Sequence, residues 1–182
     1  SDYDAFGLAP AAFGYDFFQG PMVPGVAGQD MNRNGVDDAE DYAVFDLKQV
    51  GPGYINLPMS SFGWFAAGSP ISDPTLGEYE GTLQWYNLMK GYKPTDDIDN
   101  PSPWTLGNVD GNPETKFPLA GDPVAGTGYI DGQDNYFTPG DRRLCLTAGP
   151  FDFANGETQE VVVAVLGGLG DNNISSVADL KL

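Results

Sequence analysis

The chain has 182 residues, of which 26 are acidic and 8 are basic, so its formal net charge is −18. A charge of this sign repels nucleic-acid backbones and anionic membrane surfaces, and it excludes both as expected partners. No apolar run is long enough to span a bilayer, so we expect no membrane insertion. Hydrophobic residues make up 41% of the chain, which is enough material for one folded domain over residues 1–182.

Short apolar or alternating runs are separated by 25 glycines and 15 prolines along the whole chain. This punctuation is typical of a mainly β protein with long ordered loops, and we expect a β-sandwich-like domain. The first predicted strand covers residues 13–18.

Residues 30–41, with the sequence DMNRNGVDDAED, have oxygen-bearing side chains at loop positions 1, 3, 5, 9 and 12 and glycine at position 6. Ca²⁺ takes about 6–8 oxygen ligands, and a short loop supplies them when alternate side chains point inward around a sharp turn. Glycine permits that turn. The predicted Ca²⁺ ligands are the side chains or carbonyls of Asp30, Asn32, Asn34, Val36, Asp38 and Asp41.

Two features distinguish this loop from an EF-hand. Its last position is Asp41 rather than glutamate, and the prolines and glycines before Asp30 forbid an entering helix. The loop resembles those of thrombospondin type 3 repeats and dockerins, in which calcium holds extracellular structure together. An acidic surface loop with an Asn-Gly turn and no metal is the alternative reading.

Two further strands, at residues 42–50 and 62–66, precede one amphipathic helix at about residues 74–90. Asp73 is expected to cap this helix, Pro74 suits its first turn and Gly91 ends it. Apolar residues at helical spacing predict a stripe that packs onto a sheet, formed by Leu76, Tyr79, Leu83 and Tyr86.

Residues 92–141 are expected to form a loop-rich insertion, with acidic clusters at 96–100, 108–113 and 131–135. A long irregular segment inside a compact domain needs something to order it. Further calcium ions are one possibility and Asp/Asn-Gly turn chemistry is the other, since none of the three clusters has a full ligand set.

The C-terminal part contains the clearest predicted strands, at residues 142–147 and 158–166. Residues 161–166 are apolar on both faces, which predicts a central strand rather than an edge strand. Cys145 is the single cysteine, so it forms no intrachain disulfide, and we expect a buried, inert thiol in a strand. A second helix is expected from Ser175 or Ser176 to the end of the chain.

The order of several motifs resembles that of large, mostly uncharacterised secreted proteins of Bacteroidota-like bacteria, the cargo type of type IX secretion. The resemblance covers nearly the whole chain, with motifs at 14–21 (GYDFFQGP), 56–60 (NLPMS), 86–91 (YNLMKG), 121–123 (GDP), 140–143 (GDRR), 149–151 (GPF), 160–164 (EVVVA), 167–168 (GG) and 176–178 (SVA). It implies export and attachment at the cell surface, and it implies no reaction.

The chain contains no histidine, which excludes Ser-His-Asp and Cys-His catalysis and the usual histidine-based metal sites. No phosphate-binding glycine loop is present either. The remaining enzymatic route is a glycosidase-like pair of carboxylates, which 26 acidic residues would produce by chance. We therefore expect a protein that is not an enzyme.

Two binding roles remain as expectations. The first is a calcium-stabilised structural or adhesive domain, a subunit of a cell-surface or filament-type assembly that joins copies of itself or other surface proteins through strand edges or calcium. The alternative is a carbohydrate-binding module that binds polysaccharide through aromatic side chains, for which Trp104 is the best-placed tryptophan and Trp64 and Trp85 are expected to pack inward.

Overall fold

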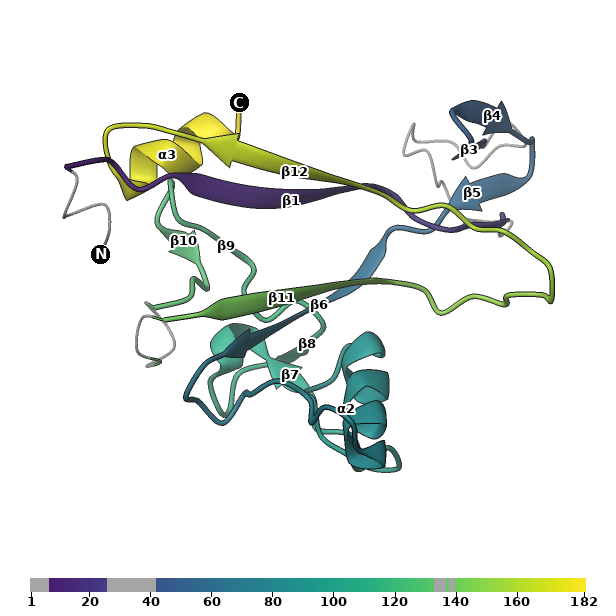
Figure 1. Cartoon of the computed structure of the whole chain (residues 1–182), viewed down its shortest axis with the longest axis horizontal. Coiled ribbons are helices and arrows are strands. Elements are labelled where there is room, and N and C mark those ends of the chain that lie inside the picture. Colours follow the sequence, from purple (N-terminus) through teal and green to yellow (C-terminus); the bar gives the residue numbers. More distant parts are fainter. Residues whose placement is uncertain (1–6, 26–41, 133–136, 138–139) are drawn as a thin grey trace. The chain divides into compact units, whose positions relative to one another are not determined.

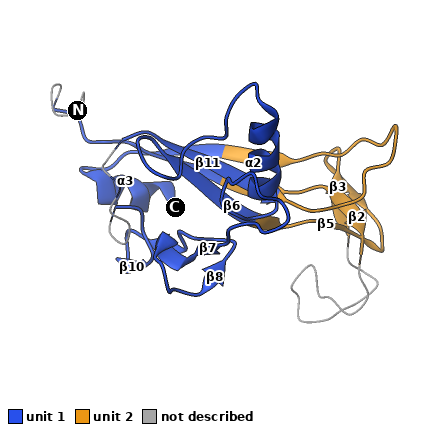
Figure 2. Cartoon of the chain, turned by 90° about the horizontal axis from the view of Figure 1, so that it is seen from below, with its two compact units in different colours: residues 1–15, 61–147, 165–182 blue, residues 16–60, 148–164 orange. Residues whose placement is uncertain are grey.

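The computed structural model describes residues 7–25, 42–132, 137 and 140–182. The described part of the chain is mainly β, with 34% strand and 14% helix, which confirms the predicted fold class. It divides into two compact units, coloured separately in Figure 2. Unit 1 comprises Ser1–Tyr15, Ser61–Thr147 and Val165–Leu182, and unit 2 comprises Asp16–Ser60 and Ala148–Ala164.

Four long strands pair two by two. Strand β1 (Ala12–Gln19) pairs with β12 (Val162–Gly168), and β6 (Met59–Ala66) pairs with β11 (Arg142–Ala148), as the ribbons in Figure 1 show. These elements confirm the strands that alternation and β-branched runs predict at residues 13–18, 62–66 and 142–147. The strand predicted at 158–166 begins later, at Val162.

The central position predicted for residues 161–166 is wrong for the described chain. Among the described residues β12 has β1 as its one strand neighbour, so it lies at the edge of a two-stranded sheet. Its valines remain substantially exposed. The composition of β12 suits a strand with neighbours on both sides, but it does not show which neighbours the chain itself provides.

Residues 92–132 form short paired elements. Strands β7 (Trp104–Thr105) and β8 (Glu114–Thr115) pair antiparallel, as do β9 (Gly121–Asp122) and β10 (Thr127–Gly128). The 3₁₀ turn η1 (Leu106–Asn108) follows β7 directly.

In unit 2, β2 (Met22–Pro24) pairs with β5 (Tyr54–Asn56). The single strand predicted at residues 42–50 is wrong, because this segment is a hairpin of β3 (Ala43–Phe45) and β4 (Lys48–Val50). Asp46 and Leu47 both have positive φ, as a type I′ turn between antiparallel strands requires. Neither residue is a glycine, so the turn lacked its usual sequence signal.

Helix α2 (Tyr79–Met89) is shorter than predicted, and its expected cap is wrong. Its N-cap residue is Glu78, whereas Asp73 accepts a hydrogen bond from Arg143 at 2.8 Å and lies outside the helix. Gly91 follows the helix with φ of 82°, which confirms the predicted end.

The predicted buried stripe of α2 is also wrong. Leu76 is 84% exposed and Tyr79 is 77% exposed, whereas Gly81, Asn87 and Leu88 are buried. Gly81 is buried against the segment before the helix, because a Cβ atom there would collide with the backbone oxygen of Thr75. A pattern of apolar residues gives no weight to a buried glycine or asparagine. The prediction therefore placed the buried face of α2 on the opposite side of the helix.

Helix α3 (Asn173–Leu180) begins before the predicted serines. Asn172 caps it by accepting hydrogen bonds from the backbone N–H groups of Ile174 and Ser175, both at 3.0 Å, and the Ser175 hydroxyl accepts from the Asn172 N–H at 2.9 Å. This reciprocal capping box starts the helix at Asn173 rather than at Ser175.

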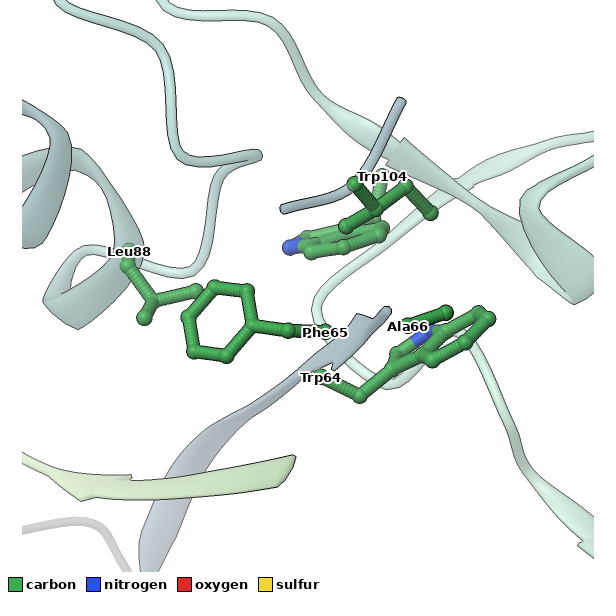
Figure 3. Close-up of a cluster of buried hydrophobic side chains, with 6 residues drawn as sticks. Trp64, Phe65, Ala66, Leu88 and Trp104 are labelled. Atoms are coloured by element: carbon green, nitrogen blue, oxygen red, sulfur yellow. The ribbon is translucent and has the colours of Figure 1, made fainter. Parts of the chain in front are cut away.

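The hydrophobic core lies in unit 1 and is aromatic. Trp64 and Phe65 of β6, Leu88 of α2 and Trp104 of β7 are buried together, as Figure 3 shows. The two indole rings stack with centroids 6.5 Å apart and planes at 20°. Gly63 makes room for this arrangement, because a Cβ atom there would collide with Leu88.

Candidate functional site

The six predicted calcium ligands lie outside the described residues, so the site remains a prediction. They are Asp30, Asn32, Asn34, Val36, Asp38 and Asp41. The described strands on either side, β2 and β3, both belong to unit 2 and contact one another.

Asn56 holds the two strands that flank this segment. Its side-chain oxygen accepts a hydrogen bond from the Val44 N–H at 2.7 Å, and its amide group donates to the carbonyls of Gly20 and Val44, both at 3.0 Å. One side chain therefore ties β3 to the chain just before β2. Asn56 belongs to the NLPMS motif, but the sequence pattern did not indicate this role.

The acidic cluster at residues 96–100 has the hydrogen bonds of a turn. The Asp97 carboxylate accepts from the N–H groups of Asp99 at 3.1 Å and Asn100 at 2.9 Å. This is the local turn chemistry that Asp favours. Within the part of the chain that the structure describes, no three Cys, Asp or Glu side chains gather into a group able to hold a metal ion.

Asn87 fixes the start of this acidic segment from inside the fold. The residue is fully buried in α2, and its amide group donates to the carbonyls of Thr95 at 2.8 Å and Asp97 at 2.9 Å. The helix thereby supplies hydrogen bonds to a segment without regular structure. The sequence pattern gave Asn87 no role of its own.

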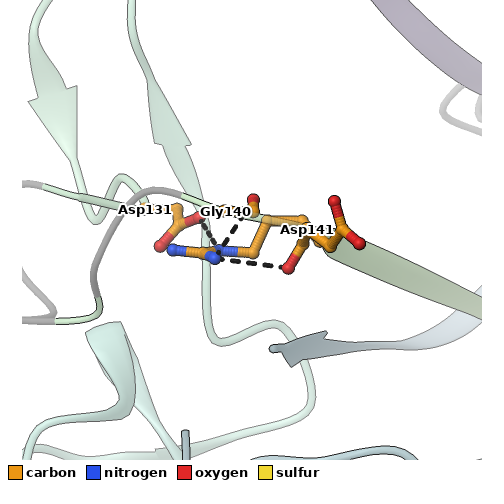
Figure 4. Close-up of polar contacts among 4 residues, drawn as sticks. Asp131, Gly140 and Asp141 are labelled. Carbon is orange, nitrogen blue, oxygen red and sulfur yellow. Dashed lines mark hydrogen bonds and ion pairs between the residues drawn. The ribbon is translucent and has the colours of Figure 1, made fainter. Parts of the chain in front are cut away.

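Asp131, from a third acidic cluster, pairs with an arginine. Arg142 donates from Nε to the Asp131 carboxylate at 2.7 Å and from Nη1 to the carbonyls of Gly140 and Asp141 at 3.3 Å, as Figure 4 shows. Its guanidinium also lies 5.8 Å from the ring centroid of Trp64. The pair is mostly buried, and it connects the start of β11 to the aromatic core.

A pocket of about 170 Å³ lies at the same end of β11, next to Arg142. Its charged lining is Asp73, Asp141 and Arg143, and Arg143 is already paired with Asp73. Both partners are substantially exposed, so water solvates them and the pair does not create a strongly charged site.

The tryptophans are poorly placed for stacking on sugars. Trp104, the best candidate from the sequence, is 0% exposed, and Trp64 is buried as predicted. Trp85, which was expected to pack inward, is 38% exposed and makes an edge contact with Phe65. The two buried indoles therefore belong to the core rather than to a binding platform.

Cys145 lies in β11, as predicted, and is partly buried beside the core. Burial raises the pKa of its thiol, and a weak contact with Thr147 opposes this only in part. A raised pKa keeps the sulfur protonated at neutral pH and lowers its nucleophilicity.

Asp122 and Lys181 connect β9 to the end of α3. The Asp122 carboxylate accepts from Lys181 Nζ at 2.5 Å and from the N–H groups of Val124 and Ala125. The hydrogen bond from Lys181 is the main cause that lowers the pKa of Asp122, and the two backbone donors add to it. The charged form of the carboxyl is therefore favoured.

We predict that Lys181→Met raises the pKa of Asp122 toward its ordinary value, measured by NMR titration of the carboxyl carbon. A lowered pKa in the folded state stabilises the fold above the unfolded pKa, and this contribution is lost as the pH falls through the folded value. Lys48→Met, which removes another exposed lysine pair, is the control and should leave the Asp122 titration unchanged. An unshifted titration in Lys181→Met would contradict the assignment of Lys181 as the main cause.

None of the three comparisons, with protein families, with curated proteins and with solved structures, finds a match for this chain. Among the described residues, no helix combines the length and the hydrophobicity that crossing a membrane requires.

Proposed function

We propose that this protein is a calcium-stabilised structural or adhesive domain of the cell surface, exported and built into a filament-type or other surface assembly, and that it is not an enzyme. Its partners would be copies of itself or other surface proteins. The calcium ligands would be those of the loop at residues 30–41.

The small hydrophobic core carries this proposal. In the described residues, the buried hydrophobic side chains beyond the aromatic core of unit 1 are Ala43 and Ile55 of unit 2. The sheets of the described residues are two-stranded, and isolated two-stranded sheets are marginally stable in water. A fold of this kind gains most from an added stabiliser such as a bound metal ion or a neighbouring protein.

The position of the predicted loop agrees with such a role. Residues 26–41 connect β2 to β3 in unit 2, which has the smaller set of buried side chains. An ion that binds the folded loop and not the unfolded chain would stabilise this part of the fold by mass action. The acidic composition favours a divalent cation, since 26 acidic residues face only 8 basic ones.

Thermal unfolding with calcium and with excess chelator tests the proposal. At a calcium concentration of about 100 times Kd, binding adds about 2.7 kcal/mol, which corresponds to a Tm shift of about 5–10 °C for a chain of this size. Asp30→Ala should remove most of this difference, because it removes the first ligand of the loop. Asp37→Ala is the matched control, since Asp37 lies between ligand positions and should keep the calcium dependence.

Identical melting curves with calcium and with chelator would refute calcium stabilisation. The assembly part is tested separately by light scattering during calcium titration and by electron microscopy of native material. A polymer or surface layer is the expected result. A monomer that is retained on a polysaccharide column would instead favour the carbohydrate-binding alternative, for which the buried Trp64 and Trp104 give no support.

A further inference from the structure

Strand β12 has an edge without a strand partner. Among the described residues β1 is its one neighbour, and no backbone hydrogen bond joins β12 to a segment outside that pair. The N–H and C=O groups along the second edge are therefore available to an incoming chain. Another extended main chain can satisfy the whole row of these groups at strand spacing.

The side chains of β12 are those of a strand with neighbours on both sides. Residues 161–166 contain four valines and no charged residue, yet Val163 is 43% exposed and Val165 is 65% exposed. Natural edge strands are usually protected by lysine, proline or a bulge, and this one has none of these. A conflict between local sequence and observed surroundings is expected where a protein binds something.

One face of the β1–β12 pair is covered in unit 1 and the other is open. Gly14 lies against Leu180, and a Cβ atom at Gly168 would collide with the backbone oxygen of Ser176, so α3 covers the face to which both glycines belong. Adjacent strand residues point to opposite faces. Phe13, Tyr15 and Val165 therefore lie on the open face, where the first two are 73% and 56% exposed.

The charges around this strand pair select the kind of partner. Residues 7–25 and 157–182 contain one basic residue, Lys181, which is already paired with Asp122. The acidic residues of the same two segments are Asp16, Glu157, Glu160, Asp171 and Asp179. A second copy of the chain would bring the same acidic residues together, whereas a strand with basic ends would complement them.

We propose that the open edge of β12 binds an extended, apolar β-strand with basic ends from another protein, which adds a third strand beside β12. Its large apolar side chains lie on the open face, where Val163 and Val165 become their cross-strand neighbours. Its basic ends lie near the acidic residues that flank β12. This inference names a partner for the proposed surface role, and it does not depend on the calcium loop.

A fluorescently labelled peptide with the sequence Lys-Lys-Val-Thr-Val-Thr-Val-Lys-Lys tests the proposal on the full chain. We expect saturable binding, measured by anisotropy, that weakens as salt is added. A peptide with proline in place of the central valine should bind at least about tenfold more weakly, because proline lacks the N–H and disrupts the ladder. A peptide with glutamate in place of each lysine should lose binding similarly.

Hydrogen exchange on the unmodified protein locates the site without any variant. The peptide should slow exchange at residues 162–168 more than in any other described strand. Val165→Asp should weaken binding about tenfold, and Leu76→Asp, which places the same charge at another exposed apolar position, should leave it unchanged. Circular dichroism establishes that both variants are folded.

Several outcomes would overturn the inference: no binding, equal binding of the glutamate peptide, or protection located elsewhere. Self-association of the chain with protection of residues 162–168 would also overturn it, because the occupant would then be a second copy. If the peptide fails to bind but the melting curve is sensitive to chelator, strand binding at β12 is refuted and the calcium proposal stands. If the peptide binds but chelator leaves the melting curve unchanged, the calcium proposal is refuted and strand binding at β12 stands.

Discussion

Trp104→Ala is expected to destabilise the protein by about 3–5 kcal/mol, the range for removing a fully buried large aromatic side chain. Trp104 is 0% exposed and stacks on Trp64, so its removal leaves a cavity and deprives the second indole of its neighbour. Marginally stable proteins have about 5–15 kcal/mol of stability in total. Urea unfolding followed by circular dichroism measures the change, and a large part of the variant could be unfolded without denaturant.

Two matched variants identify the cause of this loss. Trp104→Phe keeps an aromatic ring in the core. The indole N–H that it removes has no hydrogen-bond partner among the described residues, so this variant should lose clearly less stability than Trp104→Ala. Trp85→Ala removes an indole that is 38% exposed and should also cost less than Trp104→Ala. A Trp104→Ala variant as stable as the parent would show that residues 92–132 do not contribute to the core.

The burial of Trp104 in the core could not be predicted from the sequence. The prolines around Trp104 predicted a loop, and in a loop this tryptophan could have been exposed for binding. The tryptophan instead begins β7, which pairs with β8, and it contacts a strand about forty residues earlier in the chain. Contacts over such distances leave no local pattern, because periodicity describes only neighbours along one element.

Local patterns were reliable where a strand is long and apolar, and unreliable where small residues decide the packing. Strand β6 was predicted within a few residues, but the buried face of α2 was not. Gly63 of β6 allows Leu88 of α2 to approach, and Gly81 lies against the backbone of Thr75, so a side chain at either glycine would collide with its neighbour. The spacing of hydrophobic residues does not show where a glycine is needed for close packing.

The two candidate sites differ in how far the sequence predicts them. The calcium ligands proposed at residues 30–41 are predicted from spacing alone, because one short loop would supply all of them. The open edge of β12 could not be predicted, because the apolar run indicated a strand but not its missing neighbour. Only the pairing of the strands revealed that β1 is its one described partner.

Asn87→Leu is expected to destabilise the protein by about 1–3 kcal/mol, because it keeps the branching of the side chain but leaves two carbonyl groups without their donor. These are the carbonyls of Thr95 and Asp97, which Asn87 binds at 2.8 and 2.9 Å. Residues 93–100 should exchange amide hydrogens faster, measured by mass spectrometry, while α2 stays helical. Asn112→Leu is the control, since it removes one such bond, to Leu106, and should leave exchange at 93–100 unchanged. Unchanged exchange in Asn87→Leu would mean that another contact orders the acidic segment.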